Sequence, residues 1–107
     1  MDYLLQKYMP RIDFDSYEDF RANYKINVPE DFNFGFDVVD AWAQAEPEKR
    51  ALVWCDESGE EKVFTFTDIM KLSARAANFF RAQRVKKGSV VMLILRRRWE
   101  YWICAAA

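Results

Sequence analysis

The pattern of apolar and polar residues is clearest over residues 62–95. Residues 62–66 are typical of a short strand, and Thr67 with Asp68 is a suitable helix start, because a Thr side chain accepts a hydrogen bond from a first-turn N–H. Apolar residues then recur at helical spacing: Ile69, Leu72, Ala76 and Phe80. Residues 90–95 form a continuous apolar run, typical of a parallel strand buried on both faces. The pattern therefore predicts a βαβ unit with a right-handed crossover.

A hairpin and a helix are predicted before this unit. Residues 51–55 are apolar, and a turn containing Gly59 lets the chain return antiparallel along residues 62–66. Asp37 is a candidate cap for a helix whose apolar stripe is Val38, Val39, Trp42 and Ala45. That helix is expected to end at Glu46-Pro47, because the residue before a proline is disfavoured in a helix.

The first 35 residues have a less regular pattern. A short helix is predicted over residues 1–9, before Pro10. A second is predicted over Tyr17–Tyr24, where Ser16 opens a sequence that resembles a capping box. Residues 25–35 contain proline, asparagine and glycine, which predicts an irregular strap.

The last predicted helix covers residues 98–107 and has one apolar face: Trp99, Trp102, Ile103 and Ala106. No cap residue follows this stripe, and the predicted helices are too few to cover both faces of a three-stranded sheet. We therefore expect an α/β fold in which a β-hairpin precedes a βαβ unit with flanking helices, as an incomplete part of a larger domain. Residues 1–35 are expected to be a leader with short helices and a strap, and residues 36–107 the first part of that domain.

Composition favours a folded chain, because 51% of the residues are hydrophobic and 17% aromatic. Charge is unevenly distributed: residues 1–61 hold 15 acidic and 6 basic residues, and residues 62–107 hold 2 acidic and 10 basic. The basic half either faces an anion such as a nucleotide, CoA or nucleic acid, or is covered by the acidic leader or by further sequence. No recognition motif for nucleic acid is present, so we expect no nucleic-acid partner.

Signals for export, membrane insertion and metal binding are not evident in the sequence. No apolar run approaches the roughly 18 residues of a membrane span, and the N-terminus lacks a secretory pattern, so a cytoplasmic location is expected. Cys55 and Cys104 are expected to be reduced thiols. A metal site is not expected, because the chain has no histidine and no CxxC pair.

The segments ALVWCDESGEEKVFTFTDI and RRRWEYWICAAA, with the predicted βαβ unit between them, resemble the start of the large N-terminal domain of the acyl-CoA synthetases. These enzymes belong to the adenylate-forming, AMP-binding superfamily, and the leader is similar to that of the acetyl- and medium-chain branch. The resemblance extends from about Phe32 to Ala107. It implies an acid–thiol ligase of fatty acid metabolism that uses Mg-ATP to form an acyl-adenylate and then transfers the acyl group to CoA.

The motifs that this chemistry requires are a glycine-rich phosphate loop, acidic residues for ribose and Mg, and a C-terminal lysine; none occurs in this chain. We therefore expect no catalytic, cofactor-binding or metal-binding residue here, with ATP, Mg and CoA implied only for the complete enzyme. Arg84 stands where the family has glycine, so a left-handed backbone is expected there. Arg96, Arg97 and Arg98 follow a predicted strand, and either contact a CoA phosphate or are surface bases at a turn.

Two functions are consistent with these observations. The first is a scaffold segment of an ATP-dependent carboxylate–CoA ligase, inactive alone and completed by the remainder of the synthetase. The alternative is a free-standing interaction module that associates with a protein or with itself through an uncovered apolar face. The acyl substrate is not determined by this segment.

Overall fold

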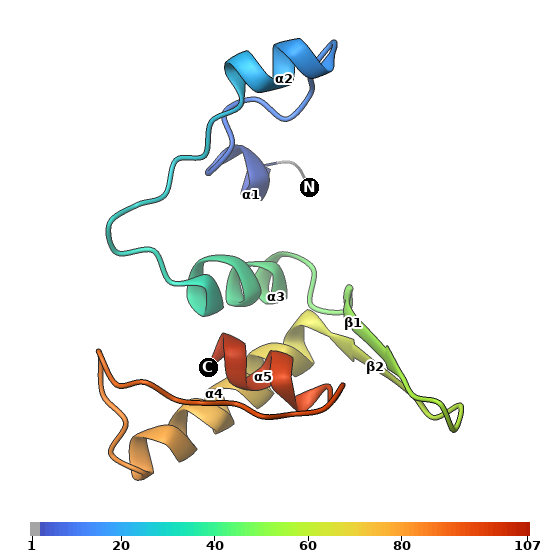
Figure 1. Ribbon diagram of the computed structural model, residues 1–107, viewed down its shortest axis with the longest axis vertical. Helices are drawn as coiled ribbons and strands as arrows, with labels where there is room; N and C mark the ends of the chain where they lie inside the picture. Colours follow the sequence, from blue (N-terminus) through green and yellow to red (C-terminus); the bar gives the residue numbers. More distant parts are fainter. Residues whose placement is uncertain (1–2) are drawn as a thin grey trace. The chain divides into compact units, whose positions relative to one another are not determined.

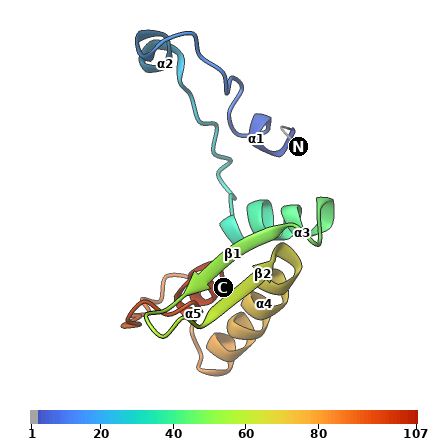
Figure 2. The ribbon, with the colours of Figure 1, turned by 90° about the vertical axis from the view of Figure 1, so that its right-hand side faces the viewer.

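The computed structural model describes residues 3–107, and the chain forms two compact units, Met1–Asn33 and Phe34–Ala107 (Figures 1 and 2). The first unit contains α1 (Tyr3–Gln6) and α2 (Tyr17–Asn23). The second contains η1 (Gly35–Asp40), α3 (Ala41–Ala45), β1 (Arg50–Cys55), β2 (Glu61–Thr65), α4 (Phe66–Ala82) and α5 (Glu100–Ala106). The part of the first predicted helix that falls on residues 1 and 2 lies outside the described residues.

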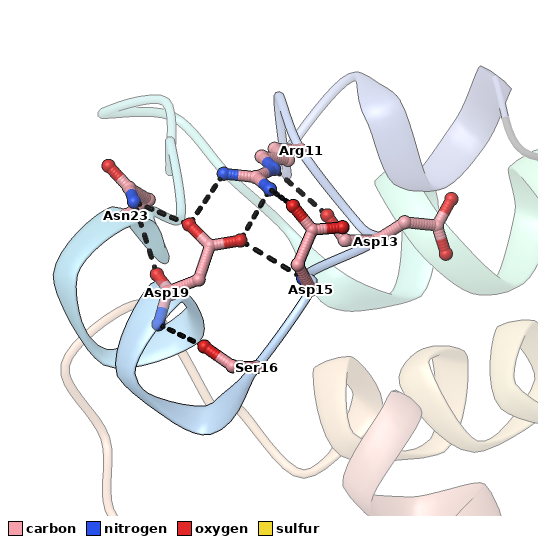
Figure 3. A network of polar contacts seen from close by, with 6 residues as sticks. All are labelled: Arg11, Asp13, Asp15, Ser16, Asp19 and Asn23. Carbon is pink, nitrogen blue, oxygen red and sulfur yellow. Dashed lines mark hydrogen bonds and ion pairs between the residues drawn. The ribbon is translucent and has the colours of Figure 1, made fainter.

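The first unit is held by a polar cluster around Asp19, shown in Figure 3. Ser16 caps α2 as predicted, since its hydroxyl accepts a hydrogen bond from the Asp19 N–H at 3.1 Å. The Asp19 carboxylate accepts hydrogen bonds from both terminal nitrogens of Arg11, from the Asp15 N–H at 3.1 Å and from the Asn23 amide at 2.7 Å. In a complete capping box, the Asp19 carboxylate accepts a hydrogen bond from the N–H of the cap residue Ser16. Here it accepts from the Asp15 N–H instead.

The second unit is organised by α4, which contacts each of η1, α3, β1, β2 and α5. Its core cluster consists of Val39, Ile69 and Ile103, which are buried and come from η1, α4 and α5. Half-buried side chains surround this cluster: Ala51, Leu52, Phe64, Phe66, Leu72, Ala76, Trp99 and Ala106. Trp99 thus packs against the core cluster. Trp102, which was predicted on the same apolar face, is 57% exposed.

The predicted hairpin is confirmed, with β1 and β2 antiparallel and lying side by side in Figure 2. Its turn is closed by Asp56, whose Oδ1 accepts hydrogen bonds from the Ser58 N–H at 2.9 Å and the Glu60 N–H at 3.0 Å. Gly59 has a φ of 85°, a left-handed conformation that glycine adopts without steric cost. A local turn therefore fixes the register, in which Val53 pairs with Val63.

Helix α4 begins two residues earlier than predicted. Thr65, not Thr67, is the cap: its hydroxyl accepts from the Asp68 N–H at 3.2 Å, and the Asp68 carboxylate accepts from the Thr65 N–H at 2.9 Å. This reciprocal capping box satisfies two backbone donors at once, which the Thr67 assignment does not. The Thr67 hydroxyl instead donates to the Pro47 carbonyl at 2.9 Å.

Two other predicted elements differ from the structure. Asp37 does not cap a helix, because it lies inside the π-helical turn η1, which follows Phe34 and continues directly into α3. Residues 90–95 form no strand, so the predicted βαβ unit is not confirmed and the described sheet has two strands. A strand requires a hydrogen-bonded neighbour, and no described segment lies in register beside this run.

The C-terminal end of α4 is closed by a left-handed residue, as expected for Arg84, whose φ is 63°. The Arg84 N–H donates to the Arg81 carbonyl at 2.9 Å, and the Val85 N–H donates to the Phe80 carbonyl at 3.1 Å. These two bonds form a Schellman motif, which normally places glycine at the left-handed position.

Replacing Arg84 with glycine is expected to stabilise the second unit by about 1 kcal/mol, because the left-handed backbone costs a residue with a Cβ atom roughly that amount. Urea unfolding measures the change. Arg84→Ala is the matched control, since it removes the same charge but keeps the Cβ atom, and it is expected to give no such gain. Equal stability of the two variants would contradict the prediction.

The pKa of Asp19 is lowered, first by the Asp15 backbone hydrogen bond and then by the Arg11 hydrogen bonds. A carboxylate with a depressed pKa in the folded state stabilises that state above its unfolded pKa, and the contribution is lost as pH falls through the folded pKa. We therefore expect the Asp19 cluster to persist at pH 4 and to open only in stronger acid, measured by NMR titration of the Asp19 carboxyl carbon.

Arg11→Gln tests the cause of this shift. It removes the guanidinium but keeps a polar side chain, so the pKa of Asp19 is expected to move up toward the ordinary value of 3.8. An unchanged pKa in this variant would show that Arg11 does not contribute.

Candidate functional site: an arginine-lined hollow

An open hollow of about 700 Å³ lies between the hairpin turn and the segment before α5. Its walls come from two stretches, Trp54–Ser58 and Arg96–Arg98. All of these residues are exposed except Trp54, which is half-buried. The structure therefore brings the three predicted arginines together with a part of the hairpin that the sequence did not associate with them.

A hydrogen bond between backbone and side chain joins the two walls. The Trp54 indole N–H donates to the Arg97 carbonyl at 2.8 Å, although the two residues are 43 positions apart in the chain. Arg97 has a φ of 50°, which is uncommon for a residue with a Cβ atom. The left-handed turn at Arg97 and the Trp54 bond together fix the backbone that carries the arginines.

The three arginines differ in their partners. Arg98 donates two hydrogen bonds to the Glu100 carboxylate, at 2.7 and 3.1 Å, and this pairing raises the pKa of Arg98 and lowers the pKa of Glu100. Arg97 lies 3.7 Å from Glu57, with both side chains about nine-tenths exposed, so water and salt weaken that pair. Arg96 makes no hydrogen bond or ion pair with any residue in the described part of the chain.

The hollow also contains acidic groups. Asp56 is engaged by its own turn, and the pKa of its carboxyl is lowered, first by the hydrogen bond from the Ser58 hydroxyl at 2.6 Å. With Asp56, Glu57 and Glu100 beside the arginines, much of the positive charge is compensated within the chain. This geometry is compatible with both predictions for Arg96–Arg98: that they contact a CoA phosphate, and that they are surface bases at a turn. Neither prediction is tested by the structure.

The sequence pattern did not associate the hairpin side of the hollow, residues 54–58, with the arginines. Trp54 was assigned to a strand and Ser58 to a turn, and both assignments agree with the structure. They lie near the arginines because of how α5 and the hairpin pack on α4. No local sequence motif predicts that packing.

Metal-ligating groups, thiols and helix length bear on other kinds of site among residues 3–107. No group of three His, Cys, Asp or Glu side chains in this range is arranged to hold a metal ion. Cys55 and Cys104 are free thiols in the structure. None of the helices over these residues has the length and apolar character needed to span a membrane.

Comparison with known proteins identifies a family match and several relatives. Residues 39–107, more than half of the chain, match the family described as AMP-binding enzyme. The human acyl-coenzyme A synthetase ACSM3, mitochondrial, is 35% identical over 100 residues, which cover 88% of this chain and 17% of the relative. The rat acyl-coenzyme A synthetase ACSM5, mitochondrial, is 41% identical over 89 residues, covering 78% and 15%.

The chain therefore spans about a sixth of the length of these relatives. Their names place them in mitochondria, so they do not support the expected cytoplasmic location, which stays a prediction.

Trp54→Phe removes the indole N–H that holds the Arg97 carbonyl while keeping an aromatic ring. A hydrogen bond of this kind contributes about 1 kcal/mol, so the free energy of unfolding of the second unit is expected to fall by about that amount. Urea unfolding measures this. Trp102→Phe is the control, since Trp102 is exposed and its indole makes no hydrogen bond to a described residue. An equal free energy of unfolding in the two variants would contradict the role of Trp54.

Proposed function

The chain belongs to the AMP-binding enzyme family, and we propose that it is a scaffold segment of an ATP-dependent carboxylate–CoA ligase. The observation that carries this proposal is the family match over residues 39–107, which falls within the second compact unit. Relatives named as acyl-coenzyme A synthetases support the same reaction class. In this proposal residues 36–107 are the first part of the AMP-binding domain, and residues 1–35 are its leader.

The reaction of the complete ligase has two steps. A carboxylate displaces pyrophosphate from Mg-ATP to give an acyl-adenylate, and the CoA thiol then displaces AMP to give the thioester. The residues described here do not fit the Mg-ATP group, because they contain no metal-binding cluster and the three glycines are isolated from one another. We therefore assign ATP, Mg and CoA binding to other parts of the enzyme and expect this segment to be inactive alone.

The contribution of this segment is structural. Ile69 on α4 packs with Val39 and Ile103, and the same helix contacts both strands of the hairpin. This arrangement gives the rest of the domain a fixed surface made of the hairpin, α4 and α5. The arginine-lined hollow lies on that surface, but no role in the reaction is assigned to it.

The second candidate function is a self-associating or protein-binding module. It is favoured by apolar side chains that remain outside: Val53 and Val63, which pair across the hairpin, are each more than half exposed, and so is Trp102. A stable homodimer of the chain in sedimentation experiments, with these residues protected, would favour the module over the scaffold.

The location is a separate proposal. The names of the relatives favour mitochondria over the cytoplasm for this protein. Fractionation of cells that express it with a C-terminal epitope distinguishes the two compartments.

ATP–pyrophosphate exchange tests the scaffold proposal. We expect no exchange by the 107-residue chain with short, medium-length or branched carboxylates. A fusion in which the remaining sequence of human ACSM3 follows Ala107 is expected to catalyse exchange, with intact ACSM3 as the positive control. Exchange by the short chain, or a folded fusion without exchange, would overturn the proposal.

Paired variants of the fusion show whether the scaffold is required. Ile69→Asp places a charge in the core cluster and is expected to abolish exchange together with folding, because a buried unpaired charge is strongly destabilising. Arg75→Gln, on the exposed side of the same helix, is expected to retain exchange.

A further inference from the structure

The turn of the β1–β2 hairpin carries an exposed serine, Ser58, in an acidic sequence. Four of the six residues from position 56 to position 61 are acidic, and Glu61 stands three positions after the serine. Protein kinases recognise substrates partly by the pattern of charge around the hydroxyl, and acidophilic serine kinases select a carboxylate three positions after it. The sequence around Ser58 therefore has the charge pattern of a substrate for such a kinase.

The structure distinguishes Ser58 from the other serine with this spacing. Of the four serines in the sequence, Ser16 and Ser58 have an acidic residue three positions on. The Ser16 hydroxyl caps α2, and the carboxylate that follows it, Asp19, is bonded to Arg11 and to nearby amides. The side chain of Glu61 is exposed and makes no ion pair or hydrogen bond with a residue in the described part of the chain. Glu61 is therefore available to a kinase, whereas Asp19 is already engaged.

The surroundings of the Ser58 hydroxyl are open. The hydroxyl donates to Asp56 Oδ1 at 2.6 Å, a bond within the same turn. The next residue is Gly59, and a Cβ atom placed on it would meet no atom within 4 Å. A kinase can therefore approach this side of the turn without displacing another element.

The opposite wall of the hollow is basic. Ser58 and the three arginines line the same space of about 700 Å³. The hydrogen bonds from Arg98 to Glu100 are the first cause of the raised pKa of Arg98, and the charges of Asp56 and Glu60 add to it. These two acidic residues stand on either side of Ser58 in the turn, so the turn lies within electrostatic range of the arginine wall.

Two of the arginines are able to accept a new anionic partner. Arg96 makes no hydrogen bond or ion pair with a residue in the described part of the chain. Arg97 lies 3.7 Å from Glu57, but the two side chains are 89 and 96% exposed, which makes that pair weak. A phosphate carries nearly twice the charge of a carboxylate and accepts paired hydrogen bonds from a guanidinium, so it competes well with Glu57 for Arg97.

We propose that Ser58 is a phosphorylation site for an acidophilic serine kinase, and that Arg96 and Arg97 hold the phosphoserine across the hollow. The γ-phosphoryl group of ATP is transferred to Ser58 Oγ. The Oγ–H bond breaks and an O–P bond forms, ADP leaves with the bridging oxygen, and the proton passes to a base of the kinase. This modification is independent of the ligase function proposed above.

Two opposing effects act on the phosphoserine. The carboxylates of the turn repel it, and these are Asp56, Glu57, Glu60 and Glu61. The arginines on the opposite wall attract it. In the proposed state the attraction is the larger effect, because the guanidinium groups of Arg96 and Arg97 bond the phosphate directly. The bond from Ser58 to Asp56 is then replaced by a link between the hairpin turn and the segment before α5.

A kinase assay tests the site of modification. The 107-residue chain is incubated with labelled ATP and a purified acidophilic serine kinase, and the label is located by mass spectrometry. Ser58→Ala is expected to reduce incorporation at least ten-fold, whereas the matched control Ser16→Ala is expected to retain it. Glu61→Gln is expected to reduce incorporation at least ten-fold as well, since it removes the recognised charge. Incorporation that is absent, or that persists in Ser58→Ala, would overturn the proposal.

Phosphorus NMR tests the contact with the arginines, on a chain synthesised with phosphoserine at position 58. A phosphorylated peptide of residues 54–62 is the reference, because it carries the same four carboxylates without the arginine wall. The second pKa of the phosphate, ordinarily about 6, is expected to be lower in the folded chain than in the peptide by about 0.5 or more, since adjacent cations favour the more charged form. An equal or higher pKa in the chain would overturn the contact.

Variants of the phosphorylated chain identify the residues responsible. The double variant Arg96→Gln, Arg97→Gln is expected to return the pKa of the phosphate to the value in the peptide. Arg75→Gln, on the exposed side of α4, is the matched control and is expected to leave the pKa unchanged. A double variant that keeps the lowered pKa would contradict the assignment to Arg96 and Arg97. These measurements read the phosphate itself, so their outcome is separate from that of the pyrophosphate exchange experiment.

Discussion

The apolar face of α4 is the constraint on which the second unit depends. Ile69 on this helix meets Val39 and Ile103, which come from elements before and after the hairpin. Because every other helix and strand of the unit contacts α4, the position of each follows from contact with that one helix. Helix α4 is itself closed at both ends by local hydrogen bonds, a capping box at Thr65 and a Schellman motif at Arg84. Helix α4 is therefore stabilised both by local hydrogen bonds at its ends and by tertiary apolar contacts along one face.

The core built on α4 is thin. No side chain among the described residues is fully buried, and large apolar groups such as Val53, Val63 and Met92 remain more than half exposed. Apolar groups that stay exposed contribute no hydrophobic stabilisation to the folded chain. The exposed groups lie on the hairpin and on the unpaired segment 90–95, which are the elements that a larger sheet would extend. This distribution agrees with a segment that is completed by further polypeptide.

Three aspartates in this chain act on nearby backbone. Asp19, Asp56 and Asp68 each accept hydrogen bonds from N–H groups within four residues, and the pKa of each is lowered. Each hydrogen bond stabilises the charged carboxylate, which is the physical cause of the shift. These three aspartates close turns and caps, so the acidic excess of the first 61 residues includes groups whose role is structural. The arginines of the hollow, by contrast, are joined to the hairpin through a backbone carbonyl.

The sequence by itself determined the features that depend on neighbouring residues: the hairpin around Gly59 and the Ser16 cap. The left-handed Arg84 was expected only from the resemblance to a family that has glycine at this position. The start of α4 at Thr65 was also readable, since Thr65 and Asp68 have capping-box spacing. Tertiary structure decided the rest. It placed Trp54 against Arg97 across 43 residues, and it left residues 90–95 unpaired although their composition is that of a buried strand. Turns and caps are completed within a few residues, whereas a strand exists only when another segment supplies its hydrogen bonds.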